Sequence, residues 1–232
     1  ADIKKIATRQ AFADTLAQIG GDENIIVMDA DLSKSTMTCT FKDKYPERHI
    51  NCGIAEANMM ATAAGIASCG KTVFAASFAM FAAGRAFEQV RNSIGYTGLN
   101  VKVVGTHAGI TVGEDGASHQ CLEDISLMRS IPGMTVLSPA DAVEAAAVTK
   151  AAAKLNGPVY LRLGRLPVPV IFDENTYEFE VGKGTQVKEG KDLTIIVTGV
   201  LLGEVLGAVG ILKEKGIDAA VVNMASFKPI DK

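Results

Sequence analysis

The sequence lacks the features that would assign it to a membrane or nucleic-acid class. No apolar stretch among its 232 residues is long enough to cross a membrane, and the N-terminus, ADIKKIATRQ, has no apolar core of a signal peptide. Its 23 basic and 26 acidic residues give a formal net charge of −3, so no basic field is available for nucleic acid. We therefore expect neither a membrane nor a nucleic acid as a partner.

Metal-binding patterns are missing as well. The four cysteines (Cys39, Cys52, Cys69 and Cys121) form no CxxC pair and are not spaced with histidine as in a zinc module. Scattered cysteines are typical of buried thiols in a reducing cytosol, so we expect a cytoplasmic protein with no metal ligands of its own. The composition, 48% hydrophobic and 21% charged, is that of a globular chain with one large domain or one and a half.

Strand and helix patterns alternate along the first two thirds of the chain. Strands are expected at 25–28, 50–53, 72–76, 101–105, 134–137 and 159–163. Helices are expected at 4–18, 54–68, 78–91 and 122–130, and from the SPAD cap to about residue 155. This alternation predicts an α/β fold with a doubly wound, mostly parallel sheet.

The last third is organised differently. Residues 166–190 contain two prolines, several charges and no clear period, and we expect a linker at 171–190 between a domain at 1–170 and a second α/β unit at 191–232. That unit has a strand in LTIIVT, a helix near 202–215 and a strand in AAVVNM. A single strand–helix–strand unit buries too little to stand alone. It therefore either packs on the first domain or begins something longer.

Glu56 lies near the start of the expected helix of small residues in the stretch HINCGIAEANMMATAAGIASC. A carboxylate at a helix start is favoured by the helix dipole, and an ordinary first-turn glutamate explains it without any chemistry. In apolar company, however, a buried carboxylate gains proton affinity and can exchange a proton with a bound base. Both interpretations stay open on this stretch alone.

The same stretch runs into a misleading motif, GIASCGKT at 65–72, which matches the P-loop pattern GxxxxGK[ST]. A P-loop follows a strand and opens a helix, whereas this segment ends a helix and leads into a strand. Gly70 is then a helix C-cap and Lys71 a cation of the last helical turn. We therefore expect no nucleotide site here, and no GxGxxG fingerprint occurs either.

The loop GTHAGITVGEDGASHQ at 105–120 is a better candidate for chemistry. It carries His107, Glu114, Asp115 and His119 on a glycine-rich backbone after a strand. Imidazole and carboxylate groups can bind sugar hydroxyls and move protons near neutral pH. A plain solvated loop is an equally good explanation of the pattern.

Aromatic and arginine residues add two further hints. Phe74, Phe78 and Phe81 border the small-residue segment, as core residues or as a flat slot for a heteroaromatic ring. Arg9 lies in the first helix, and Arg162 lies in the apolar run VYLRLG, where it needs a partner. Phosphate is one such partner.

Taken together and in this order, the blocks resemble a known family. GIAEAN, FAMFAAGRAFEQVR, GTHAGITVGEDGASHQ and the strand with Arg162 are similar to the pyrimidine-binding domain of thiamine-diphosphate enzymes, in the form found in transketolases. The resemblance covers about residues 5–170. More loosely, residues 190–232 resemble the beginning of the family's C-terminal domain.

The resemblance implies thiamine diphosphate as cofactor and assigns roles around it. Glu56 matches the glutamate that hydrogen-bonds N1′ of the aminopyrimidine and favours the imino tautomer, which takes the proton from C2 of the thiazolium. Phe78 and Phe81 match residues that stack on or flank the pyrimidine, and Asp31 matches a residue near the cofactor. An aromatic of the family's slot is replaced by Ala75.

For the substrate, the resemblance implies a sugar phosphate. Arg9, Ser35 and Arg162 match residues that hold its phosphate. His107 and His119 match catalytic residues that contact donor and acceptor hydroxyls, and Asp115 matches one that reads a hydroxyl next to the carbonyl.

Departures from the family pattern leave the exact substrate open. Ala55 and Ala57 flank Glu56 where the eukaryotic pattern has Arg and His, and Ala117-Ser118 replaces Pro-Thr. These changes resemble split transketolases and deoxyxylulose-phosphate synthase.

The family's GDGx…N segment, which binds the metal and the diphosphate, is absent. The resemblance therefore implies the C-terminal subunit of a two-chain transketolase of the pentose phosphate pathway, in a homodimer or heterotetramer. An N-terminal partner would complete the active site and hold Mg²⁺ or Ca²⁺. A deoxyxylulose-phosphate-synthase-like subunit and a non-catalytic pyrimidine-binding-like module are the alternatives.

Overall fold

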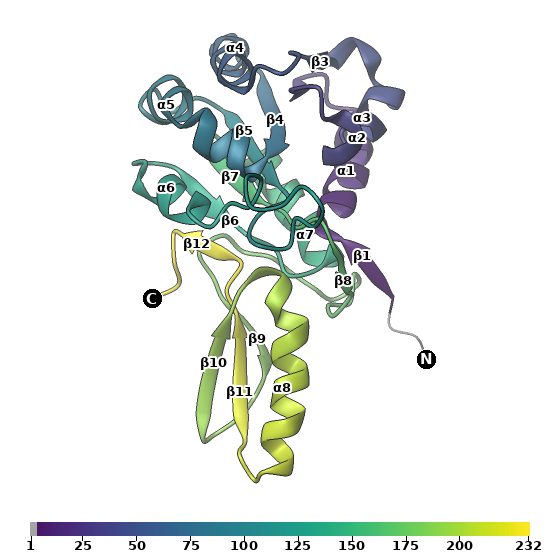
Figure 1. Cartoon of the computed structure of the whole chain (residues 1–232), viewed down its shortest axis with the longest axis vertical. Coiled ribbons are helices and arrows are strands. Elements are labelled where there is room, and N and C mark those ends of the chain that lie inside the picture. Colours follow the sequence, from purple (N-terminus) through teal and green to yellow (C-terminus); the bar gives the residue numbers. More distant parts are fainter. Residues whose placement is uncertain (1–3) are drawn as a thin grey trace.

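A seven-stranded sheet forms the frame of the larger part of the molecule, in a computed structural model that describes residues 4–232 (Figure 1). The strand order is β12-β6-β7-β5-β4-β2-β3, and all neighbours run parallel except β12, which is antiparallel to β6. The strands are β2 (Ile25–Asp29), β3 (His49–Asn51), β4 (Thr72–Phe78), β5 (Val101–Thr106), β6 (Thr135–Leu137), β7 (Val159–Arg162) and β12 (Ser226–Lys228). The expected fold class, α/β with a mostly parallel sheet, is confirmed.

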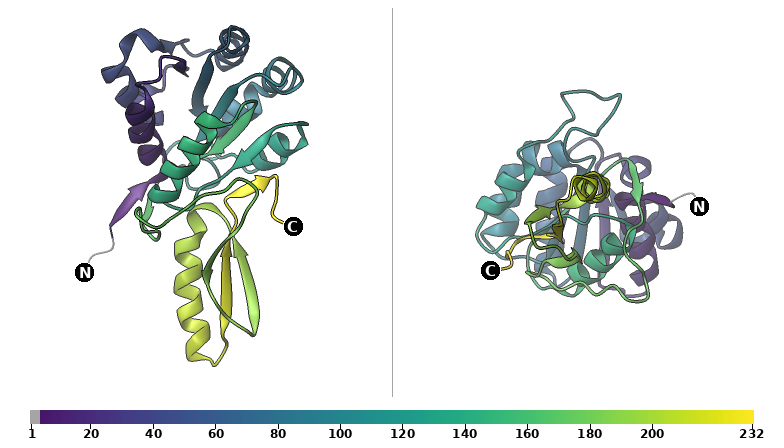
Figure 2. Two further views of the ribbon diagram at one scale, coloured as in Figure 1. Left: turned by 180° about the vertical axis from the view of Figure 1, so that it is seen from behind. Right: turned by 90° about the horizontal axis from the view of Figure 1, so that it is seen from below.

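Helices cover both faces of this sheet (Figure 2). They are α1 (Thr8–Ile19), α2 (Ser33–Thr36), α3 (Cys39–Lys44), α4 (Glu56–Ser68), α5 (Phe87–Gln89), α6 (Asp124–Ser130) and α7 (Ala142–Lys154), with a short 3₁₀ turn at Pro46–Arg48. Successive strand residues point to opposite faces. On β4, Ala75 therefore packs with α4 and α6, and Phe74 packs with α1, α3 and α7. Burial on both faces explains why the strands read as continuous apolar runs.

The first helix begins later than expected. Residues Lys5–Ala7 form strand β1, which pairs antiparallel with β8 (Pro167–Pro169), and α1 starts at Thr8. The Thr8 hydroxyl accepts a hydrogen bond from the Gly164 amide at 2.8 Å and so ties the helix start to the segment after β7. The prediction of helix at residues 4–7 was wrong because this pairing partner lies more than 150 residues away in the chain.

The expected helix at 78–91 is wound more widely than an α-helix. Phe78 still belongs to β4, and π-helical turns at Met80–Arg85 and Val90–Gly95 flank the short α5. Isolated π-turns occur often at functional sites, because the extra residue per turn redirects the side chains around it. The spacing of apolar residues cannot distinguish an α-helix, with 3.6 residues per turn, from a π-helix, with about 4.4 residues per turn, over so short a segment.

The segment at 171–190 has more structure than a linker. It contains β9 (Thr185–Lys188), which pairs antiparallel with β11 (Ala219–Asn223), and it packs Phe172 into an apolar cluster with the second unit. The amides of Ile171 and Phe172 donate to the Asp141 carboxylate at 2.7 and 2.9 Å. This segment, whose sequence has no regular period, is therefore tied to both parts of the chain.

The second unit has the expected strand–helix–strand order. β10 (Leu193–Val197), a 3₁₀ turn at Gly199–Leu201, α8 (Leu202–Glu214) and β11 follow one another, and β10 and β11 pair in parallel. The unit packs on the first domain: Asn223 of β11 donates to the buried Glu144 of α7 at 2.8 Å, and β12 joins the large sheet. Within residues 4–232, the helices are all too short or too polar to cross a bilayer.

Lys102 is a buried lysine on β5, and its ammonium group donates hydrogen bonds to backbone carbonyl groups of the segment that leads into β7. Its Nζ donates to the carbonyl oxygens of Leu155 and Gly157 at 2.7 and 2.8 Å, and to the Asn100 side chain. Burial lowers the pKa of Lys102 to about 7 from its ordinary value of 10.5. The folded chain therefore holds this proton less tightly than the unfolded chain does.

This difference predicts the pH dependence of stability. Between about pH 7 and pH 10 the unfolded state binds more protons at Lys102, so its contribution to the free energy of unfolding rises with pH. We expect Lys102→Met to remove this rise and to cost about 1–3 kcal/mol at pH 7, because buried carbonyls lose their donor. Urea denaturation of both proteins at pH 7, 8 and 9 measures the effect. Parallel pH profiles for the two proteins would contradict the expectation.

Candidate functional site

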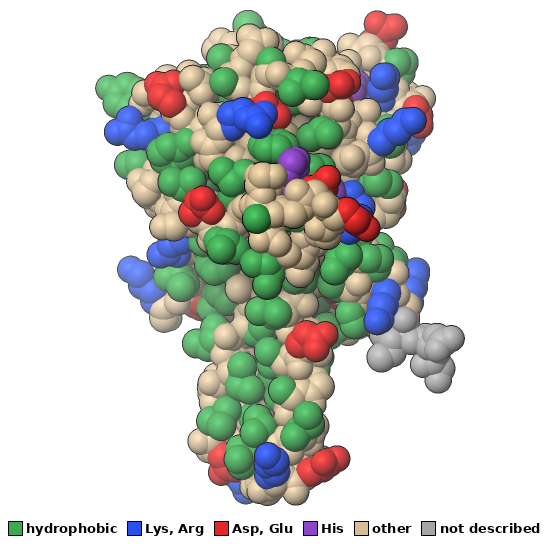
Figure 3. Space-filling model, in the orientation of Figure 1, with side chains coloured by type: hydrophobic (Ala, Val, Ile, Leu, Met, Phe, Trp, Pro, Cys, Tyr) green, Lys and Arg blue, Asp and Glu red, His purple; other side chains and the backbone are tan. Residues whose placement is uncertain are grey.

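A cavity of about 510 Å³ lies beyond the carboxyl ends of β2, β4, β5 and β7. In the sheet, β3 lies on one side of β2 and β4 lies on its other side, so the direction in which strands are added reverses at β2. Ligands of open α/β sheets bind beyond the carboxyl ends of the strands at such a reversal. The cavity is lined by Arg9, Leu32, Lys34, Ser35, Phe78, Phe81, His107, Glu114, Asp115, His119 and Arg165. Seven of the ten residues expected at the site are thus brought together. Histidine, acidic and basic side chains gather on this face (Figure 3).

Stacked rings form one wall of the cavity. The centroid of the Phe78 ring lies 3.9 Å from that of His107 and 5.8 Å from that of Phe81, with interplanar angles of 26° and 13°. The His119 ring meets Phe81 edge-on at 5.2 Å. The strand end and the π-turn therefore gather a group of rings in which Phe78 is almost fully covered, at 6% exposed, and Phe81 is half-buried.

His107 is held in an uncommon backbone conformation, with φ of 55°, and is only 3% exposed. Its Nε2 lies 3.2 Å from Arg9 Nη1, and its Nδ1 lies 3.0 Å from the Thr106 hydroxyl. Burial, followed by the positive charges of Arg9 and Arg165 and the neighbouring His119, lowers the pKa of His107 to about 3. The imidazole is therefore neutral at physiological pH.

Cationic side chains line the end of the cavity away from the stacked rings. Arg9 donates to the carbonyl oxygen of Ser35, and Arg165 Nη2 donates to Glu114 Oε2 at 2.8 Å near the exposed Lys34. Burial and the charge of Arg165 lower the pKa of Arg9, and both guanidinium groups line this end of the cavity. Such a pair favours an anionic ligand group. Arg165 was missed by the sequence interpretation, although it follows Arg162 by three residues in LRLGRLP.

Arg162 has a different environment from the one expected. Its Nε donates to Asp124 Oδ2 at 2.8 Å, and the buried Tyr160 hydroxyl donates to the same oxygen at 2.8 Å. The partner that this arginine needs is thus a carboxylate of α6, and Arg165 rather than Arg162 lines the cavity. The geometry argues against Arg162 as the phosphate ligand.

Glu56 is the first residue of α4 and is 2% exposed, as the hypothesis of a buried carboxylate required. Its Oε2 accepts a hydrogen bond from Arg85 Nη1 at 2.9 Å. The Arg85 guanidinium also lies over the Phe81 ring, 4.2 Å from its centroid. One planar cation therefore contacts both the Glu56 carboxylate and the aromatic slot. The sequence interpretation did not single out Arg85, whose partner lies 29 residues away.

Asp31 lies outside the cavity lining, on the exposed turn after β2. It has a φ of 62°, and its backbone amide and carboxylate bond the Asn51 side chain at 3.1 and 3.2 Å. Asn51 also accepts from the Gly53 amide at 2.8 Å. Asn51 thus connects the turn that holds Asp31 to the turn that leads into Glu56.

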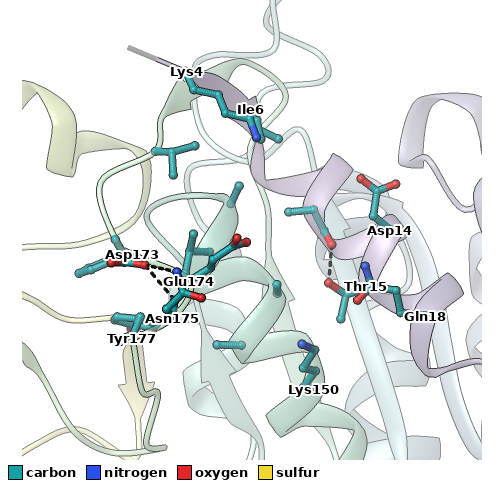
Figure 4. Close-up of a pocket in the computed structure, with 17 residues that line it drawn as sticks. Lys4, Ile6, Asp14, Thr15, Gln18, Lys150, Asp173, Glu174, Asn175 and Tyr177 are labelled. Atoms are coloured by element: carbon teal, nitrogen blue, oxygen red, sulfur yellow. Dashed lines mark hydrogen bonds between the residues drawn. The ribbon is translucent and has the colours of Figure 1, made fainter. Parts of the chain in front are cut away.

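A larger cavity, of about 800 Å³, lies between α1, α7 and residues 170–177 and contains none of the expected site residues (Figure 4). Alanine and valine side chains form much of its lining. The rim residues are engaged locally: Asp173 accepts from the Asn175 amide at 2.9 Å, and the Thr15 hydroxyl donates within α1. Polar side chains also line this cavity, but none of them was expected at the site and no histidine or arginine is among them, so the smaller cavity is the better functional site. Within residues 4–232, no three His, Cys, Asp or Glu side chains are grouped to hold a metal.

Known protein families match nearly the whole chain. A family described as "Transketolase, pyrimidine binding domain" matches residues 4–170, and one described as "Transketolase, C-terminal domain" matches residues 182–232.

Individual relatives agree with these matches. The protein named "Putative transketolase C-terminal section" of Methanocaldococcus jannaschii is 52% identical over 226 residues, which cover 97% of this chain and 72% of that protein. The "6-deoxy-6-sulfo-D-fructose transketolase subunit SqwH" of Clostridium sp. (strain MSTE9) is 42% identical, with 97% and 70% covered. A solved structure described as "Split gene transketolase, inactive beta4 tetramer" has 52% identity and a TM-score of 0.90, and covers 98% of this chain and 74% of that one.

Proposed function

This chain belongs to the transketolase family, and from that premise we propose that it is the C-terminal subunit of a two-chain transketolase. With its partner it transfers a two-carbon ketol unit from a ketose phosphate to an aldose phosphate. The observation that carries the proposal is the cavity in which an aromatic slot, two imidazoles and two arginines meet at the ends of parallel strands. The proposal divides the chain into a pyrimidine-binding domain at 1–170, a linker at 171–190 and a segment of the C-terminal domain at 191–232.

The family implies thiamine diphosphate, and the residues present fit its pyrimidine ring. The Arg85 guanidinium, a flat cation, already touches both the Glu56 carboxylate and the face of Phe81. A protonated aminopyrimidine is also flat and also donates a hydrogen bond from a ring nitrogen, so it can make the same two contacts. When bound, the cofactor would supply a nucleophilic carbon that takes up the ketol unit.

The chain's own residues would then have distinct tasks. Glu56 accepts the hydrogen bond of the pyrimidine N1′ position, and its burial keeps water from competing for that bond. Phe78 and Phe81 stack on or flank the ring, and Asp31, through Asn51, steadies the turn beside it. Arg85 must move or share the Glu56 carboxylate as the ring enters.

Sugar recognition would use the remaining polar residues. His107 and His119 contact hydroxyl groups of donor and acceptor, and Asp115 reads the hydroxyl next to the carbonyl. The phosphate is held by Arg9 and Arg165, with Lys34 and Ser35 nearby. Arg165 thus takes the role that the sequence assigned to Arg162, which is bonded to Asp124 instead.

An N-terminal partner would complete this site. Ile54, two residues before Glu56, is 79% exposed, and Leu122 and Ile110 near the glycine-rich loop are 69% and 66% exposed. Exposed apolar side chains around a site lose contact with water when another protein chain binds over them, which favours such an interface. In this proposal the partner holds the diphosphate and its Mg²⁺ or Ca²⁺, and the assembly is a homodimer or heterotetramer in the cytoplasm.

Reconstitution tests the proposal. We expect this chain alone to show no ketol transfer and weak binding of thiamine diphosphate, and to gain activity when mixed with an N-terminal chain that carries the GDG…N segment. A coupled assay of ketose phosphate with aldose phosphate measures the gain, and the N-terminal chain alone is the control. Turnover by this chain alone, or a mixture that forms a complex but neither binds the cofactor nor reacts, would contradict it. The second result would favour a non-catalytic module.

One relative points to a second candidate substrate. The subunit of Clostridium sp. is named for 6-deoxy-6-sulfo-D-fructose, so a sulfo-sugar is a second candidate donor for this chain. The Arg9–Arg165 pair can bind a phosphate or a sulfonate. A donor screen with sugar phosphates, a sulfo-sugar and pyruvate separates the candidates, since use of pyruvate would favour a deoxyxylulose-phosphate-synthase-like subunit.

A further inference from the structure

The two ring nitrogens of His107 face neighbours whose hydrogen-bonding capacity differs. Nε2 lies 3.2 Å from Arg9 Nη1, and Nδ1 lies 3.0 Å from the Thr106 hydroxyl. The Thr106 hydroxyl also lies 3.3 Å from the carbonyl oxygen of Ser77. Thr106 and Ser77 are both fully buried at the ends of β5 and β4, so water does not compete for these contacts.

Only one proton arrangement satisfies all of these contacts. A guanidinium group has donors and no acceptor, so an Nε2–H would set two donors against each other. Nε2 must therefore be the acceptor, and the proton of the neutral ring lies on Nδ1. The Ser77 carbonyl can only accept, so the Thr106 hydroxyl donates its proton to it. A lone pair of the same hydroxyl oxygen then accepts the hydrogen bond from Nδ1–H of His107. A doubly protonated ring would again face Arg9 with a donor.

We propose that Thr106 is a positioning residue: its hydroxyl, oriented by the Ser77 carbonyl, accepts from Nδ1–H of His107 and fixes this ring as the neutral Nδ1–H tautomer against Phe78. The chain of bonds runs in one direction, from Arg9 to Nε2, from Nδ1 to Thr106, and from Thr106 to Ser77. The 3.9 Å stack of His107 on Phe78 then sets the plane of the ring.

The arrangement determines what His107 can do. Its Nε2 lone pair faces Arg9 at the wall of the cavity, so in this arrangement the ring accepts a hydrogen bond there and has no proton to give. The charged groups that face it are Arg9 of α1 and Arg165 beyond β7, with His119 beside it. Glu114, which lines the same cavity, is paired with Arg165. The catalytic consequence rests on the proposed function, whereas the tautomer rests on the geometry alone.

Nitrogen NMR of the histidine side chains in the full chain tests the tautomer directly. We expect the His107 signals, assigned with His107→Gln, to show a protonated Nδ1 and an unprotonated Nε2, unchanged from pH 8 to pH 5.5. In Thr106→Val, which keeps the shape of the side chain, the Nδ1 signal should shift and its proton should exchange faster with water. Thr106→Ser, which keeps the hydroxyl, should restore both. A protonated Nε2 in the wild type, or an unchanged Nδ1 signal in a folded Thr106→Val, would overturn the proposal.

Activity of the assembled enzyme gives a second and separable readout. Thr106→Val should lower kcat about tenfold, the value of one neutral hydrogen bond, and Thr106→Ser should recover most of it. If the NMR result is as expected and the wild-type assembly has no ketol transfer, the proposed function fails while the tautomer assignment stands. If Thr106→Ser shows the expected Nδ1 signal but loses as much activity as Thr106→Val, a positioning role through the hydroxyl is excluded.

Discussion

Glu56→Gln is expected to reduce ketol transfer by the assembled enzyme by about a hundredfold to ten-thousandfold, the usual range for a group that handles a proton in the transition state. Glutamine has nearly the same size and shape as glutamate, so it can occupy the buried start of α4. It cannot, however, present an anionic oxygen to a protonated ring. The assay is the reconstituted reaction with sugar phosphates.

A matched control separates chemistry from structure. Glu204 is also a first-turn glutamate, at the start of α8, but it is exposed. Glu204→Gln should therefore leave activity unchanged, and circular dichroism should show that both variants stay folded. Comparable activity for Glu56→Gln and Glu204→Gln would mean that Glu56 is an ordinary helix-start carboxylate and would remove the proposed mechanism.

Arg165→Met is expected to raise KM for a phosphorylated donor by roughly ten- to a hundredfold, because the hydrogen bonds of a charged donor to an anion are worth about 1.5–3 kcal/mol. The effect on kcat should be small, since the phosphate lies away from the reacting carbon. An unphosphorylated donor should show little change in KM. Initial rates over a range of concentrations of each donor measure the difference.

Arg162→Met is the informative comparison for this experiment. Arg162 is bonded to Asp124, so its loss should leave a buried carboxylate without its cation and lower stability rather than substrate affinity. If Arg162→Met raised KM selectively for the phosphorylated donor and Arg165→Met did not, the role first expected for Arg162 would be restored. The two variants thus decide which arginine holds the anion.

Local patterns in the sequence were sufficient for the architecture of the first domain. The buried parallel strands, the helix of small residues after Glu56 and the loop at 105–120 follow from apolar runs and from glycine positions. The helix-to-strand context of the P-loop match is confirmed: α4 ends at Ser68, Gly70 has a φ of +87°, and Lys71 contacts Asn24 at 3.2 Å near the end of the sheet opposite the cavity. Chain order alone decided this, because a phosphate loop must lead from a strand into a helix.

Contacts between residues far apart in the chain could not be predicted from local sequence patterns. The pairing of β1 with β8, the bond between Asn223 and Glu144, and the contact of Arg85 with Glu56 join residues from 29 to more than 150 positions apart. The wider winding at Met80–Arg85 likewise has no signature in a short apolar pattern. Each depends on which surfaces meet after the sheet has formed, and that is a tertiary property.

The sequence by itself determined the fold class, the family resemblance and seven residues of the cavity, because strand ends and glycine-rich loops position side chains locally. Only the tertiary structure decided that Arg165 rather than Arg162 faces the cavity, that Arg85 pairs with Glu56, and that His107 lies between Arg9 and Thr106. A long charged side chain can reach several partners, and burial decides which one it takes, because an unpaired buried charge or donor is too costly to leave.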